Sequence, residues 1–159
     1  MKQQRLLKLV ILLSILGIFI SAYLVKVHYS ETNALCDLGP VLSCSEVSKS
    51  PQAEFLGIPL AFIGLMGYCF LGLVSYGIYL RDRLNWRNLI YQKIVSSEGL
   101  LFFSLAALLI SVYLTYSEFF IIKVICLFCL FSQVVILGIT FFSYKHHQVE
   151  KLIKKDELQ

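Results

Sequence analysis

The sequence predicts an all-α membrane protein, a four-transmembrane-helix bundle with an outer loop that contains a short helix. Three observations predict this fold class: the chain is 58% hydrophobic and only 15% charged, it contains four long apolar stretches, and its positive charges alternate between the connections of those stretches. Ordinary soluble domains are roughly 45–50% apolar and 25% charged. A chain of 159 residues cannot bury this much apolar surface as a soluble globule, which excludes a soluble enzyme and a disordered chain.

The four apolar stretches are long enough to cross a bilayer. A spanning helix needs about 20 mostly apolar residues, because each residue rises about 1.5 Å and the hydrocarbon layer is about 30 Å thick. A signal peptide is the alternative for the first stretch, but its apolar run exceeds the usual core of about 7–15 residues and no A-x-A site follows it. The predicted spans of this single domain, residues 1–159, are 6–25, 58–80, 94–116 and 124–144, with an outer loop at 27–57.

The distribution of Lys and Arg predicts the orientation of these spans, because connections rich in these residues stay in the cytoplasm. Only Lys26, Lys49 and Lys123 lie on one side of the predicted bundle. Both termini are therefore expected in the cytoplasm, with segments 27–57 and 117–123 outside. No basic stretch in a polar context is interleaved with aromatic residues, so nucleic-acid binding is not expected. The other eleven of the 14 Lys and Arg residues are Lys2, Arg5, Lys8, Arg81, Arg83, Arg87, Lys93, Lys145, Lys151, Lys154 and Lys155.

The long outer loop is a natural place for function, since long loops in compact bundles are often functional. Ser43, followed three residues later by Glu46, fits a capping box that opens a short helix, and Pro51 is expected to end it. Pro59 is expected in the first turn of the second span, where its missing N–H costs little. His28 is expected to be interfacial or a proton donor. The outer acids are expected to be solvated; they are Asp37, Glu46, Glu54 and Glu118.

Four of the five cysteines are predicted on the outer face of the membrane. Cys36 and Cys44 lie in the outer loop, and Cys126 and Cys129 form a C-x-x-C motif at the outer end of the last span. In a bacterial cell or the ER, this face is the oxidising side. Cys69 lies in the middle of the second span and is expected to act as a small hydrophobic residue. The agreement between charge and cysteine placement favours a function carried by the four outer cysteines.

The position of the C-x-x-C motif favours reactive thiols. The fourth span runs inward, so the N–H groups and the dipole at its N-terminus favour a negative charge, and the thiolate is the reactive form. Residues three apart lie on nearly one helix face, so Cys126 and Cys129 can form a disulfide with modest distortion. Two dithiol pairs within reach of each other exchange electrons through mixed disulfides. The arrangement would pass electrons from a soluble protein at the loop to a lipid-soluble quinone at membrane depth.

Two other interpretations of the cysteines remain open. The first is a non-catalytic membrane interaction protein with two structural disulfides, which would resist mild reductants and form no mixed disulfide with a partner. The second is a four-cysteine zinc site, because C-x-x-C is a common half-site. The spacing of Cys36 and Cys44 is wide for the other half of such a site.

Several motifs together resemble the vitamin K epoxide reductase family, and in particular its bacterial members. The resemblance covers essentially the whole chain. It implies a four-helix membrane bundle that surrounds a quinone, ubiquinone or menaquinone, and that is capped by the outer loop. The motifs are Leu35-Cys36-Asp37-Leu38-Gly39, Ser43-Cys44-Ser45 at Cys-x7-Cys spacing, Ser50-Pro51, Leu56-Gly57-Ile58-Pro59-Leu60 and Cys126-x-x-Cys129.

The resemblance also implies a role for each site residue. Cys36 would exchange with a protein partner, Cys44 would pass electrons to Cys126, and Cys129 would lie next to the quinone ring. Ser50 matches a serine near the family's active site and would polarise or hydrogen-bond the quinone; the other interpretation is a turn serine. The implied function is oxidation of a DsbA-like thioredoxin-fold partner at the extracytoplasmic face of the bacterial inner membrane, in support of disulfide bond formation.

The chain also departs from its relatives. Animal members place an Asn near the start of the second span and a Tyr four residues after the second C-x-x-C cysteine; this chain has no Asn between Asn33 and Asn85, and has Gln133 at the second position. Vitamin K epoxide reduction is therefore not expected. Many bacterial relatives carry a fused thioredoxin-like domain, whereas the tail here is short, so a separate partner is expected. The DsbB family places its C-x-x-C motif in the first outer loop, the reverse of the order here.

Overall fold

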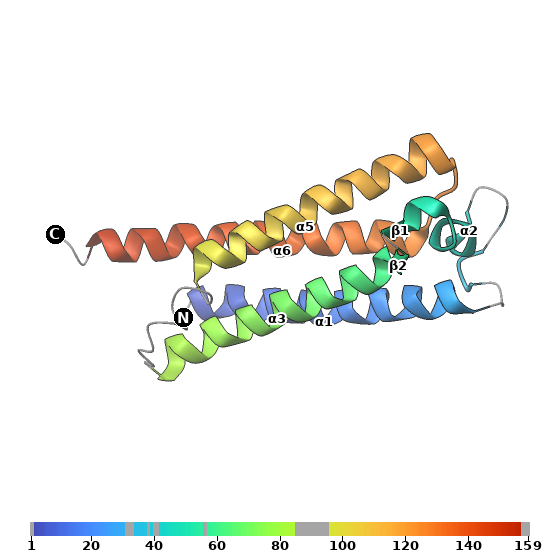
Figure 1. Cartoon of the computed structure of the whole chain (residues 1–159). Helices are drawn as coiled ribbons and strands as arrows, with labels where there is room; N and C mark the ends of the chain where they lie inside the picture. The colour runs from blue at the N-terminus through green and yellow to red at the C-terminus, as the bar shows by residue number, and fades with distance from the viewer. Residues whose placement is uncertain are drawn as a thin grey trace.

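A computed structural model describes residues 2–30, 34–37, 39, 42–55, 57–84 and 96–156 of the chain. It contains four long helices, α1 (Lys2–Tyr29), α3 (Leu60–Leu84), α5 (Ser97–Ser117) and α6 (Leu127–Asp156). Figure 1 shows these helices side by side, with the N- and C-termini at one end of the bundle and the short elements at the other. This architecture confirms the predicted all-α bundle.

All four long helices are apolar enough to cross a membrane. The apolar helical segments are Gln3–Tyr29, Leu60–Arg81, Ser97–Ile122 and Leu127–Ile153. The predicted spans overlap these segments, but the first helix continues to Tyr29 and the last to Asp156, because helical structure extends beyond the apolar residues that define a span. Arg87 and Lys93, two residues of the charge pattern, lie outside the described residues.

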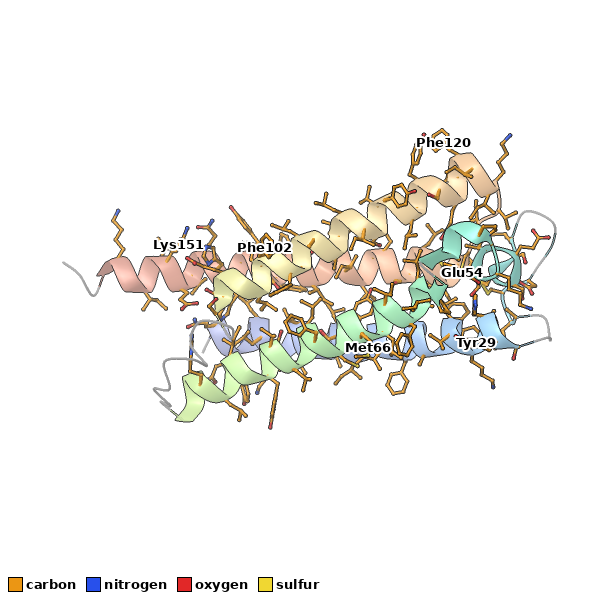
Figure 2. All side chains as sticks on the ribbon, viewed as in Figure 1. Tyr29, Glu54, Met66, Phe102, Phe120 and Lys151 are labelled. Carbon is orange, nitrogen blue, oxygen red and sulfur yellow. A yellow bond between two sulfur atoms is a disulfide. The ribbon has the colours of Figure 1, made fainter. Side chains whose placement is uncertain are left out.

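Large apolar side chains cover the outside of the bundle. Phe102 and Phe120 are 69% and 67% exposed, and Phe120 projects away from the bundle near the end of α5 (Figure 2). In water such a surface would favour aggregation, whereas in a bilayer it faces lipid chains of similar polarity. The surface therefore agrees with a multi-pass membrane protein.

Helix α1 is central to the bundle, since it packs against both α3 and α6, while α5 packs mainly on α6. Small residues allow this close packing: a Cβ added to Gly17 would lie 2.4 Å from the Tyr68 ring. Ser14 is fully buried and donates its hydroxyl to the Val10 carbonyl of its own helix, 2.9 Å away. Helices α3 and α5 contact each other less, which leaves space between them.

The short elements cover the end of the bundle opposite the termini (Figure 1). Helix α2 (Cys44–Ser48) begins after the N-cap Ser43, whose Oγ accepts from the Glu46 N–H at 3.2 Å, so the predicted helix start is confirmed. The helix ends at Ser48, before a 3₁₀ turn at Pro51–Ala53. Strands β1 (Glu54–Phe55) and β2 (Ile58–Pro59) then form a small antiparallel ladder.

The prediction that Pro59 occupies the first turn of the second span is wrong. Pro59 is paired with Glu54 in the β1–β2 ladder, which holds it in an extended conformation, and α3 begins at the next residue, Leu60. The ladder closes the outer loop immediately before the chain enters the membrane segment.

Candidate active site

Two segments that are far apart in the sequence meet at the capped end. An isolated parallel β-bridge joins Leu42, in the outer loop, to Ile125, just before α6. The bridge lies two residues before Cys44 and one residue before Cys126. Backbone pairing therefore brings the cysteines of the loop to the start of the last helix.

Three of the predicted site cysteines lie in one buried cluster. Cys36 and Cys44 form a disulfide with a Cα–Cα distance of 5.7 Å. Cys36 is 4% exposed, and Cys44 and Cys126 are fully buried, packed with Leu24, Val47 and Val124. The structure thus brings together the three cysteines to which the family resemblance gives successive roles.

Cys126 and Cys129 are both thiols in this structure. Cys126 immediately precedes α6, and its Sγ accepts a hydrogen bond from the Cys129 N–H at 3.3 Å. The sulfur thus takes the place of an N-cap oxygen, which fixes the two sulfurs on adjacent turns. Cys69 is also free, but it lies on α3 and is not among the residues that line the cavity described next.

A cavity of about 350 Å³ lies beside the cysteine cluster, enclosed by the four long helices and α2. Its walls are mostly apolar, and Cys129 is the one cysteine that lines it. Its rim includes Ile63 on α3 and Ile110 on α5, which are 38% and 54% exposed, so the cavity reaches the apolar surface between these helices. A concave, mostly apolar cavity with a few polar groups suits a small, largely apolar ligand.

Ser50 and Tyr68 supply hydroxyl groups to this cavity. Ser50 is 9% exposed, and its Oγ donates to the Val47 carbonyl at 2.8 Å, as a turn serine does. Its proton is therefore engaged, and only its lone pairs are free to accept from a ligand. The Tyr68 hydroxyl donates to the Ser132 carbonyl at 3.0 Å and shares a hydrogen bond with Ser132 Oγ at 2.8 Å, which ties α3 to α6.

Gln133, at the position where animal relatives have a tyrosine, has a packing role. Its Oε1 accepts hydrogen bonds from the hydroxyls of Ser111 and Thr115, both on α5. The residue joins α6 to α5 and is not among those that line the cavity. Where animal members have a tyrosine, this chain therefore has a residue that connects two helices and does not line the cavity.

The expectation that Asp37 is solvated is wrong. Its Oδ1 accepts from Ser43 Oγ at 3.0 Å and from the Ser45 N–H at 3.1 Å, and its Oδ2 accepts from the Ala34 N–H at 2.7 Å and from Ser45 Oγ at 2.6 Å. Partial burial alone would raise the pKa of this carboxyl, but these hydrogen bonds outweigh it and lower the pKa from 3.8 to about 2. Asp37 therefore holds the residue after Cys36 against the start of α2.

The expectation of solvation is also wrong for Glu118, which is only 3% exposed. The helical backbone continues past the predicted end of the third span into a π-helical turn, Glu118–Ile122, and the chain reverses only at Lys123, with φ 58°. Glu118 thus faces inward, where its Oε2 accepts from the Cys126 N–H at 3.4 Å. A carboxyl within an apolar stretch, eight residues before Cys126, was the sequence signal for this residue.

His28 joins the cap to α1. Its Nδ1 lies 2.6 Å from the Ser48 carbonyl oxygen, to which it donates, and its Nε2 lies 3.5 Å from Glu54 Oε1. His28 does not line the cavity, so the contacts favour a structural tie over the proton-donor interpretation.

Among the residues described, no three His, Cys, Asp or Glu side chains are grouped to hold a metal, which gives the zinc interpretation no geometric support.

The fold and these contacts define a multi-pass membrane protein whose two cysteine pairs meet beside an apolar cavity. The profile of the vitamin K epoxide reductase family matches residues 8–144, and the chain belongs to this family. Comparison with curated protein sequences gave no significant match. Membership assigns the chain thiol–disulfide oxidoreductase activity in a membrane, and the cysteine pairs that this activity needs are present.

Proposed function

We propose that the protein is a quinone-dependent protein-disulfide oxidoreductase. It would take electrons from a reduced thioredoxin-fold partner, pass them through Cys36/Cys44 and Cys126/Cys129, and deliver them to ubiquinone or menaquinone. The observation that carries the proposal is the burial of Cys36, Cys44 and Cys126 in one cluster, next to the cavity that Cys129 lines.

The first exchange takes place at the outer disulfide. A partner thiolate attacks Cys36 Sγ, the Cys36–Cys44 bond breaks, and Cys44 leaves as a thiolate; the second partner thiol then releases Cys36 and closes the partner's disulfide. Cys36 is nearly buried, but the preceding residue, Leu35, is 83% exposed. A partner that docks on this exposed edge reaches the sulfur after a small outward movement of the loop.

The second exchange takes place within the cluster. The Cys44 thiolate attacks Cys126 in a Cys126–Cys129 disulfide, and Cys129 leaves as a thiolate. Cys36 then attacks Cys44, which restores the outer disulfide and releases Cys126.

The last exchange takes place at the cavity, where a quinone accepts two electrons and two protons as Cys126 and Cys129 return to a disulfide. Cys129 would lie closest to the ring, because it lines the cavity and Cys126 does not. The Ser50 hydroxyl, whose proton is held by the Val47 carbonyl, would accept a hydrogen bond from a hydroxyl of the reduced quinone. The rim between α3 and α5 would admit the quinone from the lipid.

The charge distribution supports a location in the bacterial inner membrane, with both termini in the cytoplasm. Eleven of the 14 Lys and Arg residues lie on connections that the topology assigns to the side of the termini. The cysteine cluster lies at the opposite end of the bundle, which would be the extracytoplasmic face. A soluble DsbA-like protein on that face is the proposed partner.

A turnover assay tests the proposal. Reduced DsbA-like protein and quinone are mixed with the purified protein, and quinone absorbance is followed. Alanine at Cys36, Cys44, Cys126 or Cys129 is expected to abolish turnover, while the control Cys69→Ala keeps it. Undiminished turnover in Cys126→Ala would reject the mechanism.

A trapping experiment tests the partner separately. In a Cys44→Ala variant, Cys36 has lost its disulfide partner, so its thiol is expected to attack the disulfide of an oxidised thioredoxin-fold protein and to hold that protein in a mixed disulfide. Cysteines that resist mild reductants and trap no partner would instead favour a non-catalytic protein with structural disulfides.

A further inference from the structure

Glu118 is a buried carboxyl that the electron path described above does not use. It is 3% exposed and lines the cavity together with Cys129. Removing a carboxyl from water is costly unless its oxygens are hydrogen-bonded or the group is neutral. The position therefore needs an explanation in terms of the groups that surround Glu118.

Those groups belong to the inner cysteine pair. The Cys126 N–H donates to Glu118 Oε2 at 3.4 Å, and the Cys129 thiol lines the same cavity as the carboxyl and interacts with it electrostatically. Among the described residues, Tyr68 is the other titratable residue that lines the cavity, and its hydroxyl is engaged with Ser132. Lys123 follows the π-helical turn that contains Glu118, and Lys123 is exposed.

The chemistry at the cavity requires a group that carries protons. When the inner disulfide forms, two S–H bonds break and one S–S bond forms; two electrons and two protons move to the quinone oxygens. The cavity walls are mostly apolar, which makes bulk water a poor carrier. A base within hydrogen-bond reach of the thiol, and able to face the acceptor, meets the need.

Resting on the proposed function, we propose that Glu118 is a catalytic residue that moves one of these protons. Its carboxylate accepts the proton of the Cys129 thiol, and the resulting carboxylic acid donates that proton to a quinone oxygen. The carboxylate is then restored for the next cycle. The same side chain lines the cavity and interacts with the Cys129 thiol that also lines it, so one group can serve both transfers.

The local backbone supports this assignment. Glu118 is the first residue of the π-helical turn, and the preceding residue, Ser117, is 2% exposed and donates to the Tyr113 carbonyl at 3.1 Å. Such π-helical turns are rare and are frequently found at functional sites. The turn directs Glu118 inward, although the residues that follow it are largely exposed.

Glu118→Gln separates proton transfer from packing, because glutamine keeps the size of the side chain and an oxygen for the Cys126 N–H. The fully reduced protein is mixed with quinone, and the single-turnover rate of quinone reduction is measured across pH. We expect a loss of about 100-fold at neutral pH, within the range of general acid–base catalysis, and a rate that rises with pH as free thiolate takes over. Glu118→Asp, which retains a carboxyl, is expected to recover part of the rate and the wild-type pH profile.

The matched control is Glu46→Gln, which removes an exposed acid of α2 that does not line the cavity. It is expected to leave the rate unchanged. Glu118→Gln with the wild-type rate and pH profile would overturn the role of Glu118. A wild-type protein that reduces no quinone would instead overturn the proposed function.

A second measurement decides the role of Glu118 without quinone. The inner pair is oxidised with a soluble oxidant, and an infrared difference spectrum is recorded between its oxidised and reduced forms. A carboxyl band that changes with the redox state in the wild type and is missing in Glu118→Gln supports proton exchange with the pair. The absence of such a band in the wild type would contradict it.

Discussion

Replacing Asp37 with Asn should destabilise the closed loop that buries the Cys36–Cys44 disulfide, while leaving the membrane-spanning helices intact. The carboxylate accepts two hydrogen bonds on each oxygen, and each oxygen receives one backbone N–H, from Ala34 or from Ser45. An asparagine can turn its amide N–H₂ toward either side, but in both orientations one backbone N–H faces another donor. The serine hydroxyls can rotate to accept, whereas the backbone groups cannot.

The size of the effect follows from these contacts. A hydrogen bond to a charged acceptor contributes about 1.5–3 kcal/mol, and Asp37 is only partly buried, so we take a loss of about 2 kcal/mol. Since about 1.4 kcal/mol corresponds to a factor of ten, the population of the open loop should rise roughly 30-fold. The Cys36–Cys44 disulfide, which is nearly buried in the closed loop, should become accessible by a similar factor.

The assay is the rate at which a phosphine reductant, which works in acid, cleaves this disulfide. The lowered pKa of Asp37 determines the pH dependence of the reduction rate. The carboxylate stabilises the closed loop fully when the pH is above 3.8, the pKa of Asp37 in the open loop. This stabilisation is lost as the pH falls through about 2, the pKa of Asp37 in the closed loop. Wild-type reduction should therefore accelerate below about pH 4. Reduction of Asp37→Asn should be fast and nearly independent of pH over the same range.

Glu46→Gln is the matched control, because Glu46 is exposed on the same short helix and its side chain makes none of the four hydrogen bonds. It should be reduced at the wild-type rate. Equal rates for Asp37→Asn and the wild type near neutral pH would show that Asp37 does not hold the loop closed.

Three further substitutions test the packing and the cavity. In Gly17→Ala, the new Cβ would lie 2.4 Å from the Tyr68 ring, so the substitution should cost about 1–3 kcal/mol of stability and lower the Tm by several degrees. The control Gly67→Ala, where a Cβ would have no atom within 4 Å, should leave the Tm unchanged. Equal Tm values for the two variants would contradict the close contact at Gly17. Tyr68→Phe loses both hydrogen bonds to Ser132 and should lower the Tm by a few degrees, for a loss of about 0.5–1.5 kcal/mol per bond. Ser50→Ala should raise the KM for quinone less than tenfold, since the Ser50 proton is engaged with Val47; a larger rise in steady-state kinetics would show direct donation to the ring.

The architecture was predictable because spanning helices depend mainly on local composition. Length, apolarity and the alternation of positive charge are enough to predict all four long apolar helices. The helix ends were predicted less well, since helical structure continues into polar residues at Tyr29 and Asp156. Pro59 was misplaced because its extended conformation depends on pairing with Glu54, which is a tertiary contact.

The cysteine positions were visible in the sequence, but the surroundings of the cysteines were not. The environment of Asp37 arises from hydrogen bonds across the loop, to Ala34 on one side and to Ser43 and Ser45 on the other, so composition around Asp37 suggested only a surface acid. The sequence predicts an outer turn at Glu118 because the predicted span ends at residue 116, whereas the helical backbone continues to Ile122. The π-helical turn that keeps it inside has no simple sequence signature.

The central claim is that the outer and inner cysteine pairs exchange electrons through Cys44 and Cys126. The most direct measurement uses a Cys36→Ala, Cys129→Ala double variant, in which Cys44, Cys126 and Cys69 are the remaining cysteines. After mild oxidation in membranes, mass mapping should find a disulfide between Cys44 and Cys126. Free thiols at both positions, or a disulfide from either of them to Cys69, would contradict the proposed path.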